Sequence, residues 1–168
     1  MGYTHLTDIG QFVSPFLFTK SSGTWTPTVA SNTVLDLKTA ASETVVMTCP
    51  VMLFGSTVGT QGARLKSIRL WYGVATAALT SFNTVAVLNQ LLGADGAVSG
   101  AAFASTIDSN HDSSAKRVTV ASHCMTITPD VPVFIRKNRT FWLHLSFVAA
   151  ATSVFSNYGA YLDFDLRI

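Results

Sequence analysis

The sequence predicts an all-β protein: an antiparallel β-sandwich of the jelly-roll kind, preceded by an extended N-terminal arm. Three observations support this fold class. Apolar and polar residues alternate with period two along several segments, as they do on half-buried strands. Clusters of Gly, Pro, Ser and Asn separate these segments, and no long stretch shows a convincing helical period. About nine or ten short strands without intervening helices favour an antiparallel sandwich or barrel.

The C-terminal stretch, residues 140–168, has the clearest strand pattern. One side of its first run is apolar, and the other side carries a tryptophan, a histidine and a serine: Phe141, Leu143, Leu145 and Phe147 against Trp142, His144 and Ser146. After a polar break at residues 156–159, the alternation resumes with Leu162 and Phe164 on one side. We therefore expect two half-buried strands, paired and joined at this break.

Further strands are predicted upstream, and together they make residues 31–168 a single domain. Their expected ranges are residues 33–37, 44–54, 64–75, 82–92, 101–107, 116–128 and 133–136. A helix over residues 85–92 is the alternative for part of the fourth range. Leu65 and Ile68 are out of phase by one residue, which is typical of a β-bulge. Polar loops are expected at residues 55–62, 93–100 and 108–114.

Residues 1–30 are interpreted as an extended arm, because prolines at positions 15 and 27 disfavour a central strand. The arm is rich in aromatic residues and needs a surface to cover it. Two readings stay open: the arm wraps its own domain, or it lies on a neighbouring subunit. The predicted interface residues come from the arm and from two strands: Phe12, Phe16, Phe18, Trp25, Trp71 and Trp142.

The composition indicates a surface that is partly covered by other subunits. Hydrophobic residues make up 48% of the chain and charged residues only 12%, whereas about 25% charged residues is usual. No apolar run reaches the roughly 18 residues of a membrane-spanning helix, and no signal peptide is recognisable. The formal net charge of +2 is too mild to predict nucleic-acid binding. Interface cores are depleted of charge, so a homo-oligomer is expected.

Cys49 and Cys124 lie far apart in apolar runs, and we expect buried free thiols, with a disulfide as the open alternative. His123 and Cys124 are neighbours on a predicted strand. They should therefore point to opposite faces and not form a thiolate–imidazole pair. The four histidines show none of the short spacings of a zinc site.

Residues 108–112 carry oxygen-bearing side chains at alternating positions, as calcium loops do. Ser113 and Thr119 stand where an EF-hand needs Gly and Glu. We interpret the segment as a hydrophilic loop tip, with a looser Ca²⁺ or Mg²⁺ site as the alternative.

Asp163 and Asp165 share one face of a strand, at a spacing of roughly 6–7 Å that would suit the carboxylate pair of a glycoside hydrolase. Their apolar neighbours and the following Arg167 favour an ordinary strand face. No catalytic, cofactor-binding or metal-binding residues are predicted, and the chain is not expected to be an enzyme. Trp71 and Trp142 on exposed faces allow a sugar-stacking platform, although packing is the favoured reading.

Three segments carry a resemblance to a known group: YGVATAALTSFNTVAVLNQ at residues 72–90, HDSSAKRVTVASHCMTIT at 111–128 and FVAAATSVFSNYGAYLDFDLRI at 147–168. They resemble small all-β proteins of tailed bacteriophages and uncultured viral genomes. The resemblance covers about the C-terminal two thirds of the chain. It implies a virion component, such as a capsid decoration (cement) protein or another head or tail subunit.

The predicted function is therefore that of a virion structural protein, most directly a capsid decoration subunit that assembles through its arm and sandwich faces. The expected partners are further copies, a trimer by analogy with decoration proteins, and the major capsid protein. Neither nucleic acid nor a membrane is expected as a direct partner. The alternative is a carbohydrate- or receptor-binding module of a virion tail that uses Trp71, Trp142 and Tyr158.

Overall fold

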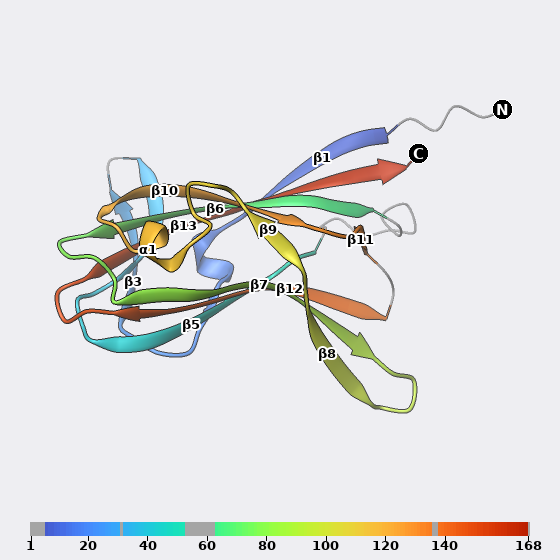
Figure 1. The fold of residues 1–168 in the computed structure, drawn as a ribbon, viewed down its shortest axis with the longest axis horizontal. Coiled ribbons are helices and arrows are strands. Elements are labelled where there is room, and N and C mark those ends of the chain that lie inside the picture. Colours follow the sequence, from blue (N-terminus) through green and yellow to red (C-terminus); the bar gives the residue numbers. More distant parts are fainter. Residues whose placement is uncertain (1–5, 31, 53–62, 136–137, 168) are drawn as a thin grey trace.

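The computed structural model describes residues 6–30, 32–52, 63–135 and 138–167. These residues form two antiparallel sheets packed face to face, which confirms the predicted all-β sandwich (Figure 1). The predicted loop at residues 55–62 and the end of the strand expected at 44–54 lie outside the described residues.

Sheet A has the strand order β3-β4-β13-β6-β10-β9, with β1 also paired to β13 and β11 to β6. Its strands are β1 (Leu6–Val13), β3 (Trp25–Ala30), β4 (Thr33–Lys38), β6 (Arg64–Ala75), β9 (Ser105–Ile107), β10 (Ala121–Pro129), β11 (Val133–Phe134) and β13 (Val154–Arg167). Sheet B has the order β2-β5-β12-β7-β8. Its strands are β2 (Thr19–Lys20), β5 (Glu43–Pro50), β7 (Ser81–Leu92), β8 (Val98–Phe103) and β12 (Arg139–Ala149).

Eight of these strands have jelly-roll connectivity. In chain order they are β4, β5, β6, β7, β8, β10, β12 and β13. Each lies in the opposite sheet from the strand before it, except that β7 and β8 are neighbours in sheet B. Sheet A then holds the first, eighth, third and sixth of the eight, and sheet B the second, seventh, fourth and fifth. The predicted jelly-roll architecture is therefore confirmed.

The C-terminal stretch forms two long strands as expected, but the predicted pairing between them is wrong. β12 lies between β5 and β7 in sheet B, and β13 lies between β4 and β6 in sheet A. The chain crosses between the sheets at residues 150–153, where the Ser153 hydroxyl donates to the carbonyl of Ala78 at 2.7 Å. Alternation identifies the buried face of each strand, but two strands facing one core from opposite sheets show the same alternation as a pair.

The predicted polar break at residues 156–159 is instead a bulge inside β13. The pairing with β6 shifts between Asn157 and Gly159, and Gly159 has φ of +100°. The buried Asn157 amide donates to the carbonyl of Pro15 at 3.3 Å and accepts from the Gly159 N–H at 3.1 Å. The bulge predicted between Leu65 and Ile68 is confirmed, since the register of β6 against β13 shifts there as well.

The core lies between the sheets and is rich in aromatic rings. Tyr72, Phe82, Phe147 and Phe155 contact one another, with Phe147 stacked on Phe155 at 4.4 Å between ring centroids. Each of the four occupies an inward-facing position on its own strand, β6, β7, β12 or β13. The period-two alternation of side chains therefore places all four in the core.

Two segments differ from the predicted elements. Residues 116–120, expected in a strand, belong to a short helix α1 (Ser114–Arg117) and the turn after it; β10 begins only at Ala121. The weak strand expected over 101–107 is divided into β8 and β9, which lie in different sheets. Residues 85–92, for which a helix was the alternative, are part of strand β7.

Residues 6–30 lie against the chain's own sandwich. β1 pairs with β13, β2 with β5 and β3 with β4. Between β1 and β2, a 3₁₀ turn η1 (Pro15–Leu17) brings Val13 and Phe18 into the core. Lys20 pairs with the buried carboxylate of Asp36, and its ammonium also donates to the carbonyl of Pro15. Of the two readings left open for the arm, the described residues follow the first.

Candidate functional site

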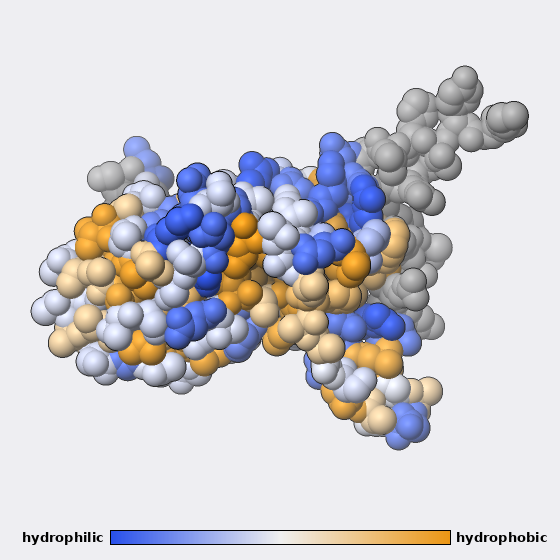
Figure 2. Space-filling view, viewed as in Figure 1, coloured by the Kyte–Doolittle hydropathy of each residue, from blue (hydrophilic) through white to orange (hydrophobic). Residues whose placement is uncertain are grey.

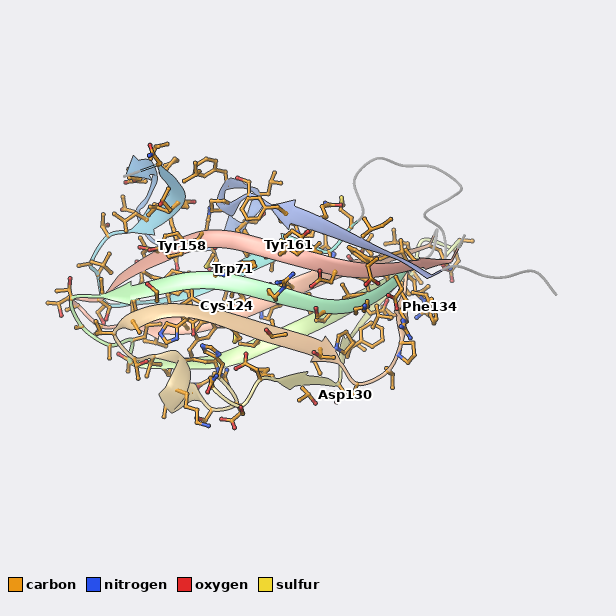
Figure 3. The ribbon with its side chains drawn as sticks, turned by 90° about the horizontal axis from the view of Figure 1, so that it is seen from above. Trp71, Cys124, Asp130, Phe134, Tyr158 and Tyr161 are labelled. Atoms are coloured by element: carbon orange, nitrogen blue, oxygen red, sulfur yellow. The ribbon has the colours of Figure 1, made fainter. Side chains whose placement is uncertain are left out.

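A groove lined by aromatic side chains lies on the outer face of sheet A. Phe12 of β1, Trp71 of β6, and Tyr158 and Tyr161 of β13 line it, and it encloses about 380 Å³. We call it the aromatic groove. Figure 3 shows Trp71, Tyr158 and Tyr161 together on this face. Phe12 is 56% exposed, and the other three rings are half-buried. Solvent therefore reaches these rings without unfolding of the sheet.

Glycines on adjacent strands let the rings lie close to the backbone. A Cβ atom at Gly10 would overlap the Tyr161 ring, and one at Gly159 would lie 2.9 Å from the Phe12 ring. At Gly73 a Cβ would lie 3.1 Å from the Tyr158 hydroxyl. Each ring thus covers a glycine of a neighbouring strand, an arrangement that protects the glycine backbone and holds the ring close against the sheet.

A polar pocket of about 470 Å³ adjoins the aromatic groove and shares Tyr161 with it. In this pocket Arg69 makes a two-pronged ion pair with Asp163, at 3.2 Å from Nε and 3.3 Å from Nη2. The Ser67 hydroxyl donates to the same carboxylate at 2.9 Å. The Arg69 guanidinium also lies 4.9 Å from the Tyr161 ring centroid and 5.7 Å from that of Trp71. Arg69 therefore joins the polar pocket to the aromatic groove.

Asp165 is the second carboxylate of the pair considered for glycoside hydrolysis. It is buried and paired with two basic side chains. Arg64 pairs with one of its oxygens, and Lys66 lies 3.3 Å from the other. Burial alone would raise the pKa of Asp165, but hydrogen bonds from Arg64 and Lys66 outweigh it, so the pKa is lowered. Both Asp163 and Asp165 are thus paired with basic side chains of β6.

The hairpin of β7 and β8 projects from the body of the sandwich (Figures 1 and 2). Five of the six residues of β8 are exposed, from both of its faces, and Val98 is 60% exposed. β8 is the terminal strand of sheet B, so one of its edges has no partner strand among the described residues. β8 and the chain on either side of it are also uncharged, since residues 97–107 contain no Asp, Glu, Lys or Arg.

The six predicted interface residues fall into three groups. Phe12 and Phe16 are exposed and Trp71 is half-buried, so these three retain free surface. Phe18 is only 3% exposed in the core, and Trp25 packs edge-on against Phe155 at 6.2 Å. Their aromatic surface is covered largely by their own chain, because η1 and β3 fold back onto the sandwich.

Trp142, the sixth predicted residue, lies on the outer face of sheet B, where its indole N–H donates to Thr140 at 3.2 Å. The suggested platform of Trp71 with Trp142 is therefore wrong, because the two residues occupy opposite sheets. Tyr158 does lie beside Trp71, and sequence reasoning missed Tyr161 and Phe12 as its companions. Pairing between neighbouring strands brings these four rings together. The spacing of residues within a single strand does not predict this arrangement.

Sequence reasoning also missed a contact between two histidines. His111 Nε2 lies 3.2 Å from His123 Nδ1, and both side chains are buried. The other nitrogen of His111 faces Asp108 at 2.9 Å, and that of His123 faces the carbonyl of Thr119 at 2.9 Å. Asp108, the two imidazole rings and the carbonyl of Thr119 thus form one continuous chain of polar contacts beneath the outer face of sheet A.

Asp108 is oriented toward hydrogen-bond donors of its own chain. It accepts from the N–H of Thr126 at 2.7 Å, from that of Asn110 at 3.0 Å and from His111. Burial raises its pKa, but these hydrogen bonds outweigh that effect, and the pKa is lowered. Asp112 pairs with Lys116 at 2.8 Å. Within the described ranges no group of three or more His, Cys, Asp or Glu side chains is placed to hold a metal ion.

The two cysteines are both free, but only Cys49 is buried. Burial raises the pKa of the Cys49 thiol to about 12. Cys124 is exposed, contrary to expectation, because it lies on the outer face of sheet A opposite Trp71. His123, its neighbour, points inward and stacks on Tyr72 at 4.5 Å, so the predicted divergence of the two side chains is confirmed.

No known family model matches the chain, and neither does any curated protein. In the part of the chain that the structure describes, no helix has the length and apolar character needed to cross a membrane.

Proposed function

We propose that this protein is a virion structural protein, and specifically a capsid decoration subunit that assembles into a homo-oligomer and onto the major capsid protein. The role is structural rather than enzymatic. Two lines of support come from the fold and the sequence. Jelly rolls are common among viral capsid domains, and three segments of the chain resemble virion components of tailed phages. Because one fold hosts many functions, the fold alone does not identify the role, and a particular surface of this protein must support it.

The observation that carries the proposal is the projecting β7–β8 hairpin. Gly93 and Ala97 form the closing hydrogen-bonded pair of its turn, with 2.8 Å between N and O. Bonded and non-bonded pairs alternate along an antiparallel ladder. In the observed register, the N–H and C=O groups of Val98, Gly100 and Ala102 therefore point away from β7, toward the free edge.

A free edge of this kind is a template for another strand. Monomeric proteins protect such edges with lysine, proline or covering loops, whereas β8 contains neither lysine nor proline and five of its six residues are exposed. Leu92 and Val98 are exposed apolar residues at the tip of the same hairpin. A second copy that adds a strand to β8 would satisfy the edge groups and cover both apolar side chains. Homo-oligomers close by symmetry, and a trimer is the expected form.

The test is the solution mass of the full chain, measured by light scattering over a range of concentrations, with Ala102→Lys as the perturbation. Ala102 is exposed on β8, so a lysine there leaves the core unchanged and opposes strand addition. Ala115→Lys, which changes an exposed alanine of α1, is the matched control. We expect a multiple of the 18.0 kDa chain mass for wild type and for the control, and a monomer for Ala102→Lys.

A monomeric wild type at every concentration would contradict self-assembly in solution. The remaining route, assembly on a preformed lattice, is tested by adding the protein to capsids of the virus that encodes it. If wild type neither self-associates nor sediments with those capsids, the decoration function is refuted.

A further inference from the structure

We propose that the aromatic groove on the outer face of sheet A, together with the adjoining polar pocket, binds a saccharide. The binding surface is formed by Phe12, Trp71, Tyr158 and Tyr161, with Ser67, Arg69 and Asp163 at one end. It lies on the opposite sheet from the β8 edge, so it is a separate function from the proposed assembly.

The shape of the aromatic surface suits a sugar ring. Three of the rings cover glycines of neighbouring strands, so they are held close to the sheet by the backbone beneath them. A pyranose ring presents a face of C–H groups, and such faces pack well on an aromatic ring held in a fixed position. The groove volume of about 380 Å³ lies within the range of roughly 300–1,000 Å³ that is typical of small-ligand sites.

The polar end of the surface suits the hydroxyl groups of a sugar. Sugar hydroxyls donate and accept hydrogen bonds, so a site for them needs both kinds of group beside the rings. Arg69 supplies donors, Asp163 supplies acceptors, and the Ser67 hydroxyl does both. The ion pair of Arg69 with Asp163 fixes the two groups before a ligand arrives, so little side-chain freedom is lost on binding.

A proline-rich peptide is the main competing ligand, because such peptides also dock in aromatic-lined grooves. The polar pocket favours the saccharide. Polyproline segments offer few hydrogen-bond donors, and they would leave the donor and acceptor groups of Ser67, Arg69 and Asp163 without a ligand partner.

The experiment has two stages and uses the full chain. A printed glycan array is first probed with protein detected through an affinity tag, since a label on Cys124 would lie opposite Trp71. The best glycan is then titrated by calorimetry into wild type, Trp71→Ala, Ser67→Ala and Trp142→Ala. We expect Trp71→Ala to weaken binding about tenfold, as for loss of an aromatic contact. Ser67→Ala should weaken it roughly threefold.

Trp142→Ala is the matched control, because it removes the same side chain from the other sheet and should leave the affinity unchanged. Circular dichroism and thermal unfolding establish that each variant is folded. If Trp71→Ala does not fold, Ser67→Ala and Arg69→Lys decide the question. The proposal is overturned if the array shows no binding, if only Trp142→Ala weakens binding, or if a proline-rich peptide binds the groove and no glycan does.

Discussion

Asp108 offers the sharpest test of how the structure holds the chain between β9 and β10. Asp108→Asn keeps the size of the side chain but replaces one acceptor oxygen with an NH₂ donor. If the remaining oxygen still serves Asn110 and His111, the new NH₂ group faces the N–H of Thr126 at the 2.7 Å position. One charge-assisted hydrogen bond is lost, and a partly buried N–H is left opposed to another donor. Each effect costs about 1.5–3 kcal/mol when fully buried.

Asp108 retains some solvent exposure, so we expect a combined loss of about 2–4 kcal/mol in the free energy of unfolding. Urea denaturation at pH 7 measures this loss. Asp112→Asn is the control: it removes the same charge from the same loop, where the exposed pair with Lys116 contributes only about 0–1 kcal/mol. A loss below 0.5 kcal/mol for Asp108→Asn, or an equal loss for both variants, would refute the reasoning.

The pH dependence of this difference follows from the lowered pKa of Asp108. A carboxyl whose folded pKa lies below its unfolded value stabilises the fold above the unfolded pKa, near 3.9. That contribution is lost as the pH falls through the folded pKa. The gap between wild type and Asp108→Asn should therefore be full at pH 7 and shrink below about pH 4. A gap that stays constant down to pH 2 would show that the charge of Asp108 contributes nothing.

Three further predictions concern the bulge, the thiols and the N-terminal strands. Gly159→Ala should lower the free energy of unfolding by roughly 3 kcal/mol or more, against about 1 kcal/mol for Gly96→Ala. Both glycines have positive φ, but only at Gly159 would a Cβ meet the Val13 carbonyl, at 2.5 Å; equal losses in urea denaturation would contradict this. Ellman's reagent should modify Cys124 in the native protein and Cys49 only after unfolding; rapid modification of both would argue against a buried Cys49. Deletion of residues 1–30 should abolish cooperative thermal unfolding, because Val13 and Phe18 belong to the core; a cooperatively folded deletion variant would show that the arm is dispensable.

Period-two alternation predicted the strands well where one face is buried. The bounds expected for β6 match the observed Arg64–Ala75, and even its bulge was visible as the phase slip after Leu65. The same rule fails for residues 116–120, where Val118 and Val120 imitate a strand. In the structure Val118 packs against the core from the turn after α1, and Val120 is exposed. A short segment with two apolar residues carries too little pattern to separate these cases.

The candidate sites were harder to predict, because each is assembled across strands. Alternation placed Trp71 and Trp142 on outer faces correctly, yet it contains no information about which sheet each strand joins. His111 and His123 are likewise twelve positions apart in the chain, on either side of α1, and yet their rings are in contact. Residue spacing identifies side chains that meet on a single helix or strand. It therefore gives no indication of a contact between residues from different elements.

The N-terminal residues illustrate why exposed character in a sequence does not identify an interface. Phe12 and Phe18 are chemically identical and six positions apart, yet one is 56% exposed in the aromatic groove and the other is in the core. The difference arises at η1, where the Ser14 side chain and Pro15 begin a turn that redirects the chain from sheet A to sheet B. An aromatic-rich, proline-punctuated segment therefore need not be an arm for another subunit. Here its strands pair with strands of the chain's own sheets, and Phe12, Phe16, Leu17 and Val29 are the large apolar side chains that this segment leaves exposed among the described residues.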